Sequence, residues 1–159
     1  MVWEANVDER DDLGETPLFK ACEQGHLSTV QFLFDQGAKL TIKNLKRETP
    51  LHKACENGQE NVVKFLIAKG VDINAKDREG KTALFKVYVH KHENIVKYLL
   101  AYGVNTYIEN YRKEIPVHIT MKNGYETIEQ NLILSDDNTK EECGGGSDGD
   151  IDGGMEPFL

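Results

Sequence analysis

The sequence predicts an all-α solenoid, a stack of similar helical units, and three observations support this fold class. The stretch 48–80, ETPLHKACENGQENVVKFLIAKGVDINAKDREG, is 33 residues long and recurs one period earlier at 15–47 and one period later at 81–113. Repetition at such a period is typical of solenoids, whose units pack only on their neighbours. In addition, each copy opens with a helix-start signal, and apolar residues follow it at helical spacing.

The helix-start signal is a threonine, usually followed by proline. Thr16-Pro17 and Thr49-Pro50 open the first two copies, and Thr82 keeps the hydroxyl without the proline. A threonine hydroxyl caps the free N–H groups of a first turn, and proline costs no hydrogen bond at the first helical position. We therefore expect a capped helix to begin directly after each of these threonines.

The second half of each copy carries the apolar stripe of an amphipathic helix. In the second copy the stripe consists of Val62, Val63, Phe65, Leu66 and Ile67, and in the third of Ile95, Val96, Tyr98, Leu99 and Leu100. Glycines at Gly37, Gly70 and Gly103 end these second helices, as glycine commonly does.

The pattern T-P-L-H-x-A-x-x-x-G, then an apolar helix, then G-x-D-x-N-x-x-D, resembles the ankyrin repeat. The resemblance covers residues 15–134. It implies an all-α ankyrin-repeat solenoid of stacked helix-turn-helix units with hairpin loops and about four repeats, at 15–47, 48–80, 81–113 and, more weakly, 114–134.

In this family the histidine of the motif bonds the threonine hydroxyl and ties neighbouring repeats. His52 and His118 occupy its position, whereas Phe19 and Phe85 replace it, and Ile115 removes the threonine of the fourth copy. We therefore expect a complete polar tie in the second repeat alone.

The turn between the two helices of a repeat favours glycine, because its backbone is left-handed there. Gly25, Gly58 and Gly124 hold this position, and the third copy has Lys91 instead. The lysine should cost roughly 1 kcal/mol of local strain.

The segments outside the three strong copies differ in character. Residues 5–14 align with residues 38–47, the end of a repeat, which leaves two interpretations of residues 1–14 open: an N-terminal arm that covers the first repeat, or the remainder of a longer array. Polar residues at Glu129, Asn131 and Asp136 indicate a capping repeat that ends near position 134. Residues 135–159 are rich in glycine and acid, which predicts a disordered tail.

The net charge of −8 is unevenly distributed. Residues 1–15 hold six acids and one arginine, and residues 135–159 hold eight acids and one lysine, which leaves 13 acids and 17 bases between them. A weakly basic array lies between two acidic ends, and this argues against a dedicated nucleic-acid binder.

Several classes of function find no support in the sequence. No catalytic motif, phosphate loop or metal-ligand spacing occurs, so we expect neither an enzyme nor a cofactor. Asp148, Asp150 and Asp152 match half of a calcium loop, but Leu159 stands where a bidentate glutamate is needed, so any calcium binding should be weak.

The chain also lacks an apolar run of membrane-spanning length and a signal peptide at its start. Cys22 and Cys55 lie one period apart and are predicted to be buried free thiols, as in a reducing compartment, whereas Cys143 falls in the tail. We expect an intracellular monomer, cytoplasmic or nuclear.

The resemblance implies protein recognition, with binding positions on the hairpin tips and on the exposed face of each first helix. Carried to this sequence, these candidate positions are Leu45, Lys46, Arg78, Tyr111 and Arg112 on the hairpins, and Glu56, Asn57, Val89 and His90 on the first helices. Tyr107 and Tyr102 are aromatic candidates nearby. Large apolar and aromatic side chains tend to carry binding energy.

Three further candidates are Lys20, Lys53 and Lys86, which recur at one position of the first helices. Stacking predicts a lysine ladder with rungs about 10 Å apart. The ladder has two interpretations: lysine stems that lie over apolar surface, or a basic strip for an acidic segment such as the chain's own tail.

The sequence thus favours a scaffold or adaptor that acts by binding another protein. The alternative is a targeting fragment of a larger adaptor or effector enzyme whose catalytic domain lies elsewhere.

Overall fold

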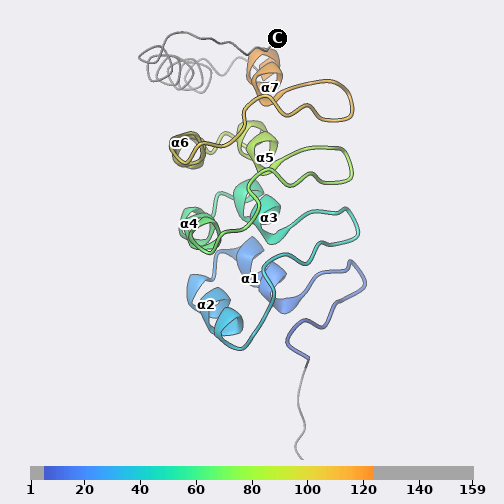
Figure 1. Ribbon diagram of the computed structural model, residues 1–159, viewed down its shortest axis with the longest axis vertical. Helices are drawn as coiled ribbons and strands as arrows, with labels where there is room; N and C mark the ends of the chain where they lie inside the picture. Colours follow the sequence, from blue (N-terminus) through green and yellow to red (C-terminus); the bar gives the residue numbers. More distant parts are fainter. Residues whose placement is uncertain (1–5, 124–159) are drawn as a thin grey trace, which may run out of the picture.

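The computed structural model describes residues 6–123, with side chains as far as Ile119, and it confirms the all-α solenoid (Figure 1). Its helices are α1 (Pro17–Gln24), α2 (Leu27–Asp35), α3 (Pro50–Glu56), α4 (Glu60–Ala68), α5 (Ala83–Val89), α6 (Glu93–Ala101) and α7 (Pro116–Asn123).

The helices form two layers with the hairpins on one side. The first helices of the repeats, α1, α3, α5 and α7, stack in one column, while α2, α4 and α6 stack in a second (Figure 1). The hairpins project away from the second column and lie above one another. Side chains with similar positions in the repeat therefore form rows along the long axis of the molecule.

The helix starts follow the predicted capping chemistry in two repeats. The Thr16 hydroxyl accepts a hydrogen bond from the N–H of Phe19 at 3.1 Å, and Thr49 does the same for His52 at 3.3 Å. The predicted cap at Thr82 is wrong. In α5 the Phe85 N–H bonds the Thr82 carbonyl at 3.1 Å instead, a tight first turn that leaves no donor for the hydroxyl.

The polar tie of the second repeat is complete. His52 Nδ1 accepts a hydrogen bond from the Thr49 N–H at 3.1 Å and lies 2.9 Å from the Thr49 hydroxyl. The ring proton is therefore on Nε2, which donates to the carbonyl of Lys81 in the next repeat at 2.9 Å. Burial lowers the pKa of His52 below its ordinary value, so the neutral ring is the form that makes this tie.

The interhelical turns are left-handed in all three full repeats. Gly25 and Gly58 have φ of 75° and 71°, and Lys91 adopts 61° despite its side chain. A side chain of the next repeat packs against each of the two glycines. At Gly25, for example, Gln59 Nε2 donates a hydrogen bond to the Glu23 carbonyl at 3.0 Å. This hydrogen bond joins successive repeats at the helix ends opposite the hairpins.

The core runs continuously between the two columns. Its largest fully buried side chains include Phe19, Phe85 and Tyr88, so the two phenylalanines at the histidine position pack as apolar core. Cys22 and Cys55 are buried free thiols as predicted, and burial raises the pKa of Cys22 to about 12.

Candidate partner-binding surface

The hairpin tips are joined into one continuous edge. At the base of each hairpin an aspartate or asparagine side chain accepts two backbone N–H groups; Asp77 Oδ1, for example, bonds Glu79 and Lys81 at 2.8 and 2.9 Å. Backbone hydrogen bonds then link one tip to the next, from Arg78 to Lys46 at 2.9 Å and from Tyr111 to Glu79 at 3.0 Å. The edge is therefore a fixed backbone frame from which tip side chains project.

Residues 6–15 take part in this frame. The Asp11 N–H bonds the Glu15 carbonyl at 3.0 Å, and the Leu45 N–H bonds the Leu13 carbonyl at 3.0 Å. The segment thus has the hairpin geometry that its alignment with residues 38–47 predicts. It supplies the first tip of the edge.

Large apolar side chains gather on the hairpins. Four of the seven exposed large hydrophobic residues of the described chain lie there: Leu13, Leu45, Tyr107 and Tyr111, at 58%, 56%, 60% and 67% exposure. Several large exposed apolar side chains on one side of the molecule are typical of a protein-binding surface.

Tyr111 is held in place although its ring is the most exposed of the four. The ring lies across Gly80, where an added Cβ would approach its Cδ1 to 2.8 Å. The Lys76 ammonium lies 5.7 Å from the ring centroid. A partner that contacts Tyr111 therefore meets a side chain that is already ordered, which reduces the entropy cost of binding.

The three lysines form the predicted ladder, but their charge is compensated. Lys20 Nζ lies 2.5 Å from Glu15 Oε2, Lys53 Nζ lies 3.3 Å from Glu56 Oε1, and Lys86 Nζ lies 3.0 Å from Glu48 Oε1. The prediction of a basic strip is therefore wrong, because carboxylates of the hairpin bases and first helices reach the same row. Lys20 is the most open of the three, with 43% of its side chain exposed.

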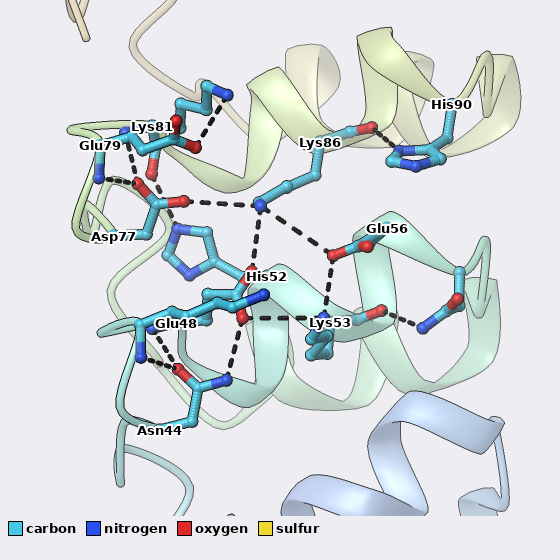
Figure 2. Close-up of polar contacts among 12 residues, drawn as sticks. Asn44, Glu48, His52, Lys53, Glu56, Asp77, Glu79, Lys81, Lys86 and His90 are labelled. Atoms are coloured by element: carbon cyan, nitrogen blue, oxygen red, sulfur yellow. Dashed lines mark hydrogen bonds and ion pairs between the residues drawn. The ribbon is translucent and has the colours of Figure 1, made fainter. Parts of the chain in front are cut away.

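The centre of the ladder is a cluster of five charged groups between α3, α5 and two hairpins (Figure 2). The Lys86 ammonium points into it and also reaches Asp77 Oδ2 at 3.5 Å and Glu56 Oε1 at 3.9 Å. Lys53 Nζ reaches Glu48 Oε2 at 3.6 Å. Glu48 and Asp77 are almost completely buried, so this cluster joins two repeats from inside.

The pKa values of the cluster follow from burial and pairing. Burial raises the pKa of Glu48, but hydrogen bonds from Asn44 and Lys86 outweigh it and bring the pKa below its ordinary value. Burial lowers the pKa of Lys86, and its bond to Glu48 outweighs this effect, so the pKa is raised. Both groups are therefore charged at neutral pH.

The candidates on the first helices lie close together, but they differ in how far contacts within the fold already occupy their side chains. Val89 is exposed at the end of α5, next to His90, whose Nδ1 lies 3.0 Å from the Lys86 carbonyl. Asn57 Nδ2 donates to the Lys53 carbonyl at 3.1 Å, and Glu56 belongs to the ion cluster. Val89 is thus the candidate whose side chain is least used by the fold.

Comparison with known families agrees with this architecture. A family model described as ankyrin repeats, in three copies, matches residues 3–77, and the model of a single ankyrin repeat matches residues 79–111. The chain belongs to the ankyrin repeat family. Ankyrin repeats generally act as protein–protein interaction modules, and they are typically non-catalytic.

The described part of this ankyrin array shows neither a metal-binding cluster nor a membrane-spanning helix. Residues 6–123 contain no group of three or more His, Cys, Asp or Glu side chains placed to hold a metal ion. None of the helices in that range is long and apolar enough to cross a membrane. Asp148, Asp150 and Asp152 lie outside the described residues, as do the predicted cap and tail.

Sequence reasoning missed two exposed apolar residues of the ankyrin array. Leu13 lies at the first tip, one period before the predicted Lys46, so the alignment of residues 5–14 with 38–47 was sufficient to find it. Phe32 is 62% exposed on α2, on the helix layer away from the hairpins. Nothing in the sequence distinguishes it from buried Val30 or from half-buried Leu33 and Phe34 on the same helix.

Proposed function

We propose that this ankyrin array is a scaffold or adaptor module that binds another protein through its hairpin tips and the exposed ends of its first helices. The observation that carries this proposal is the exposure of four large apolar side chains on the hairpins: Leu13, Leu45, Tyr107 and Tyr111. Tip-to-tip hydrogen bonds hold three of these side chains, Leu13, Leu45 and Tyr111, on a single frame. Val89 adds a separate exposed apolar side chain at the C-terminal end of α5.

The buried lysine cluster has a supporting role in this proposal. Because Lys53 and Lys86 are held by carboxylates of the fold, they brace the hairpins against the first helices. The binding surface therefore shifts from the lysine row, where the sequence places part of it, to the tips. Lys20 remains a candidate at the margin, because its side chain is partly open.

The test is affinity capture from a lysate of the cells that produce the protein, followed by mass spectrometry. A variant with Leu45→Ala, Tyr107→Ala and Tyr111→Ala is compared with a control that carries Phe32→Ala and Tyr102→Ala, which removes exposed apolar side chains from the second-helix layer. Circular dichroism first establishes that both variants fold.

A partner that binds the parent and the control but not the hairpin variant supports the proposal. A partner that the hairpin variant retains, and that the control loses, places the binding surface on the second helices. Capture of no protein by the parent removes the support for a binding function.

We further infer that the module works inside the cell. Cys22 and Cys55 are free and buried, which suits a reducing compartment. Fractionation of the producing cells with an antibody to the chain tests this inference, and recovery only from the medium contradicts it.

A further inference from the structure

The charges of the array separate into two parallel strips. The first is the basic tip edge, which we define as the tips of the second, third and fourth hairpins, residues 45–47, 78–80 and 111–113. It carries five bases against a single acid, Glu79. The five bases are Lys46, Arg47, Arg78, Arg112 and Lys113, and all are exposed.

The second strip is the inner strip of hairpin bases and first helices, and its balance is the opposite. Its lysines are the three of the ladder and Lys81, which pairs with Glu79 at 3.0 Å, and six acids lie within 4.0 Å of the ladder lysines: Asp11, Glu15, Glu23, Glu48, Glu56 and Asp77. An acidic segment is therefore attracted to the tips and repelled by the surface next to them. The difference in charge between the two strips therefore favours binding of such a segment along the tips.

The bases of the tip edge are not used by the fold. Among residues 6–123, no ion pair involves Lys46, Arg47, Arg78 or Arg112, and Lys113 reaches only Glu109, at 3.6 Å, with 83% of its side chain exposed. This contrasts with the ladder lysines, each of which contacts at least two carboxylates.

Backbone strain gives an independent reason to assign these bases a role. The third tip residue is left-handed in every described hairpin: Gly14 and Gly80 have φ of 79° and 80°, whereas Arg47 and Lys113 have 61° and 64°. A side chain is costly in this conformation, and glycine is not. Since both side chains are exposed, packing does not compensate for the strain, and strain of this kind tends to mark functional positions.

The two strained tips also share one order of residues. In Leu45-Lys46-Arg47 and in Tyr111-Arg112-Lys113, an exposed apolar side chain is followed directly by two bases. The Arg78 tip lies between them. Along the edge, a partner therefore meets apolar and basic groups in alternation.

We propose that the basic tip edge binds an acidic, extended segment of a partner protein whose apolar side chains contact Leu45 and Tyr111. The proposal rests on the proposed function and specifies its partner. Stacked repeats are about 10 Å apart, and an extended chain covers this distance in about three residues. The segment therefore places an acidic or apolar residue on the edge at about every third position.

The test uses a displayed library of random 16-residue peptides, selected on the full chain. Enriched peptides are then measured by fluorescence anisotropy against a tip variant, Arg47→Gly with Lys113→Gly. The control variant, Lys64→Gln with Lys97→Gln, removes the same two charges from the second helices α4 and α6.

We expect enrichment of peptides that combine acidic and apolar residues. Their affinity should fall about tenfold in the tip variant, from two lost charge contacts of somewhat under 1 kcal/mol each, and less than about twofold in the control. The tip variant should also unfold at a higher temperature than the parent, because glycine removes the strain. Loss of binding with a gain of stability separates this role from a structural one.

The other outcomes each overturn the proposal. Enrichment of basic or neutral peptides contradicts it and leaves the proposed function intact, whereas a parent that selects no peptide and forms no cross-link to its own residues 135–159 removes the support for both. A tip variant that binds as well as the parent excludes the edge, and one that is less stable refutes the strain argument. Carbodiimide cross-links between Lys46 and the chain's own residues 135–159, with no peptide enriched, assign the edge to the tail instead.

Discussion

Replacing Lys86 by methionine should destabilise the protein strongly, although the side chain keeps a similar length. The change removes the ammonium that lies 3.0 Å from Glu48 Oε1 and 3.5 Å from Asp77 Oδ2. Each of these carboxylates has only 4% of its side chain exposed. Removing one partner of a buried ion pair typically costs about 3–5 kcal/mol, because the remaining charge stays buried.

The expected cost in this protein is lower, because each of the two carboxylates keeps other partners. Glu48 keeps a hydrogen bond from Asn44 at 2.9 Å and an ion pair with Lys53 at 3.6 Å. Asp77 keeps the two backbone N–H groups of its hairpin. We therefore expect a loss of about 2–3 kcal/mol in the free energy of unfolding at pH 7.

The assay is urea unfolding followed by circular dichroism at several pH values. The control is Lys97→Met on α6, an exposed position where a change should stay within about 0.5 kcal/mol. Because Lys86 helps to lower the pKa of Glu48, the stability that this pairing contributes is complete above pH 4.5 and is lost as the pH falls through the folded-state pKa. The difference between parent and variant should therefore narrow below pH 4.5. A variant as stable as the control at pH 7, or a difference independent of pH, refutes the reasoning.

Three further predictions follow from single sites. Lys91→Gly should raise the free energy of unfolding by about 1 kcal/mol, because φ is 61° there; no gain in the urea midpoint over Lys91→Ala contradicts this. Burial lowers the pKa of His52, so its contribution to the free energy of unfolding is complete above pH 6.5 and declines as the pH falls through the folded-state pKa. The urea midpoint of His52→Gln should therefore vary less than that of the parent between pH 7.5 and 5.5, and an unchanged pH profile refutes the assignment of a neutral ring. Burial raises the pKa of Cys22 and Cys55, so peptide mapping after brief iodoacetamide treatment should find both unmodified in the native protein and alkylated in urea.

Much of the fold could be predicted because single residues within each repeat determine local features of its backbone. Thr49, Pro50 and Gly58 each prescribe one backbone feature, and the structure has the cap, the helix start and the left-handed turn in those places. Thr82 shows the limit of such reasoning. Its hydroxyl is as close to a helix start as the others, but whether it caps depends on how tightly the first turn closes, which the residue itself does not determine.

The binding surface was harder to predict, because exposure and charge balance depend on how repeats stack. The recurrence of Lys20, Lys53 and Lys86 correctly predicts a row. Its charge is set by Glu48 and Asp77, which lie 38 and 9 residues from Lys86 along the sequence and meet it only in the folded array. A row of bases in the sequence therefore becomes an acidic strip in the structure.

The measurement that tests the central claim most directly is photo-crosslinking from single positions in the producing cells. Benzoylphenylalanine replaces Tyr111 at the hairpin tip or Phe32 on α2, two side chains with similar exposure of 67% and 62%. If the hairpin tips hold the partner, irradiation gives a discrete adduct from position 111 and none from position 32. An adduct from position 32 alone, or equal adducts from both, contradicts the assignment of binding to the tips.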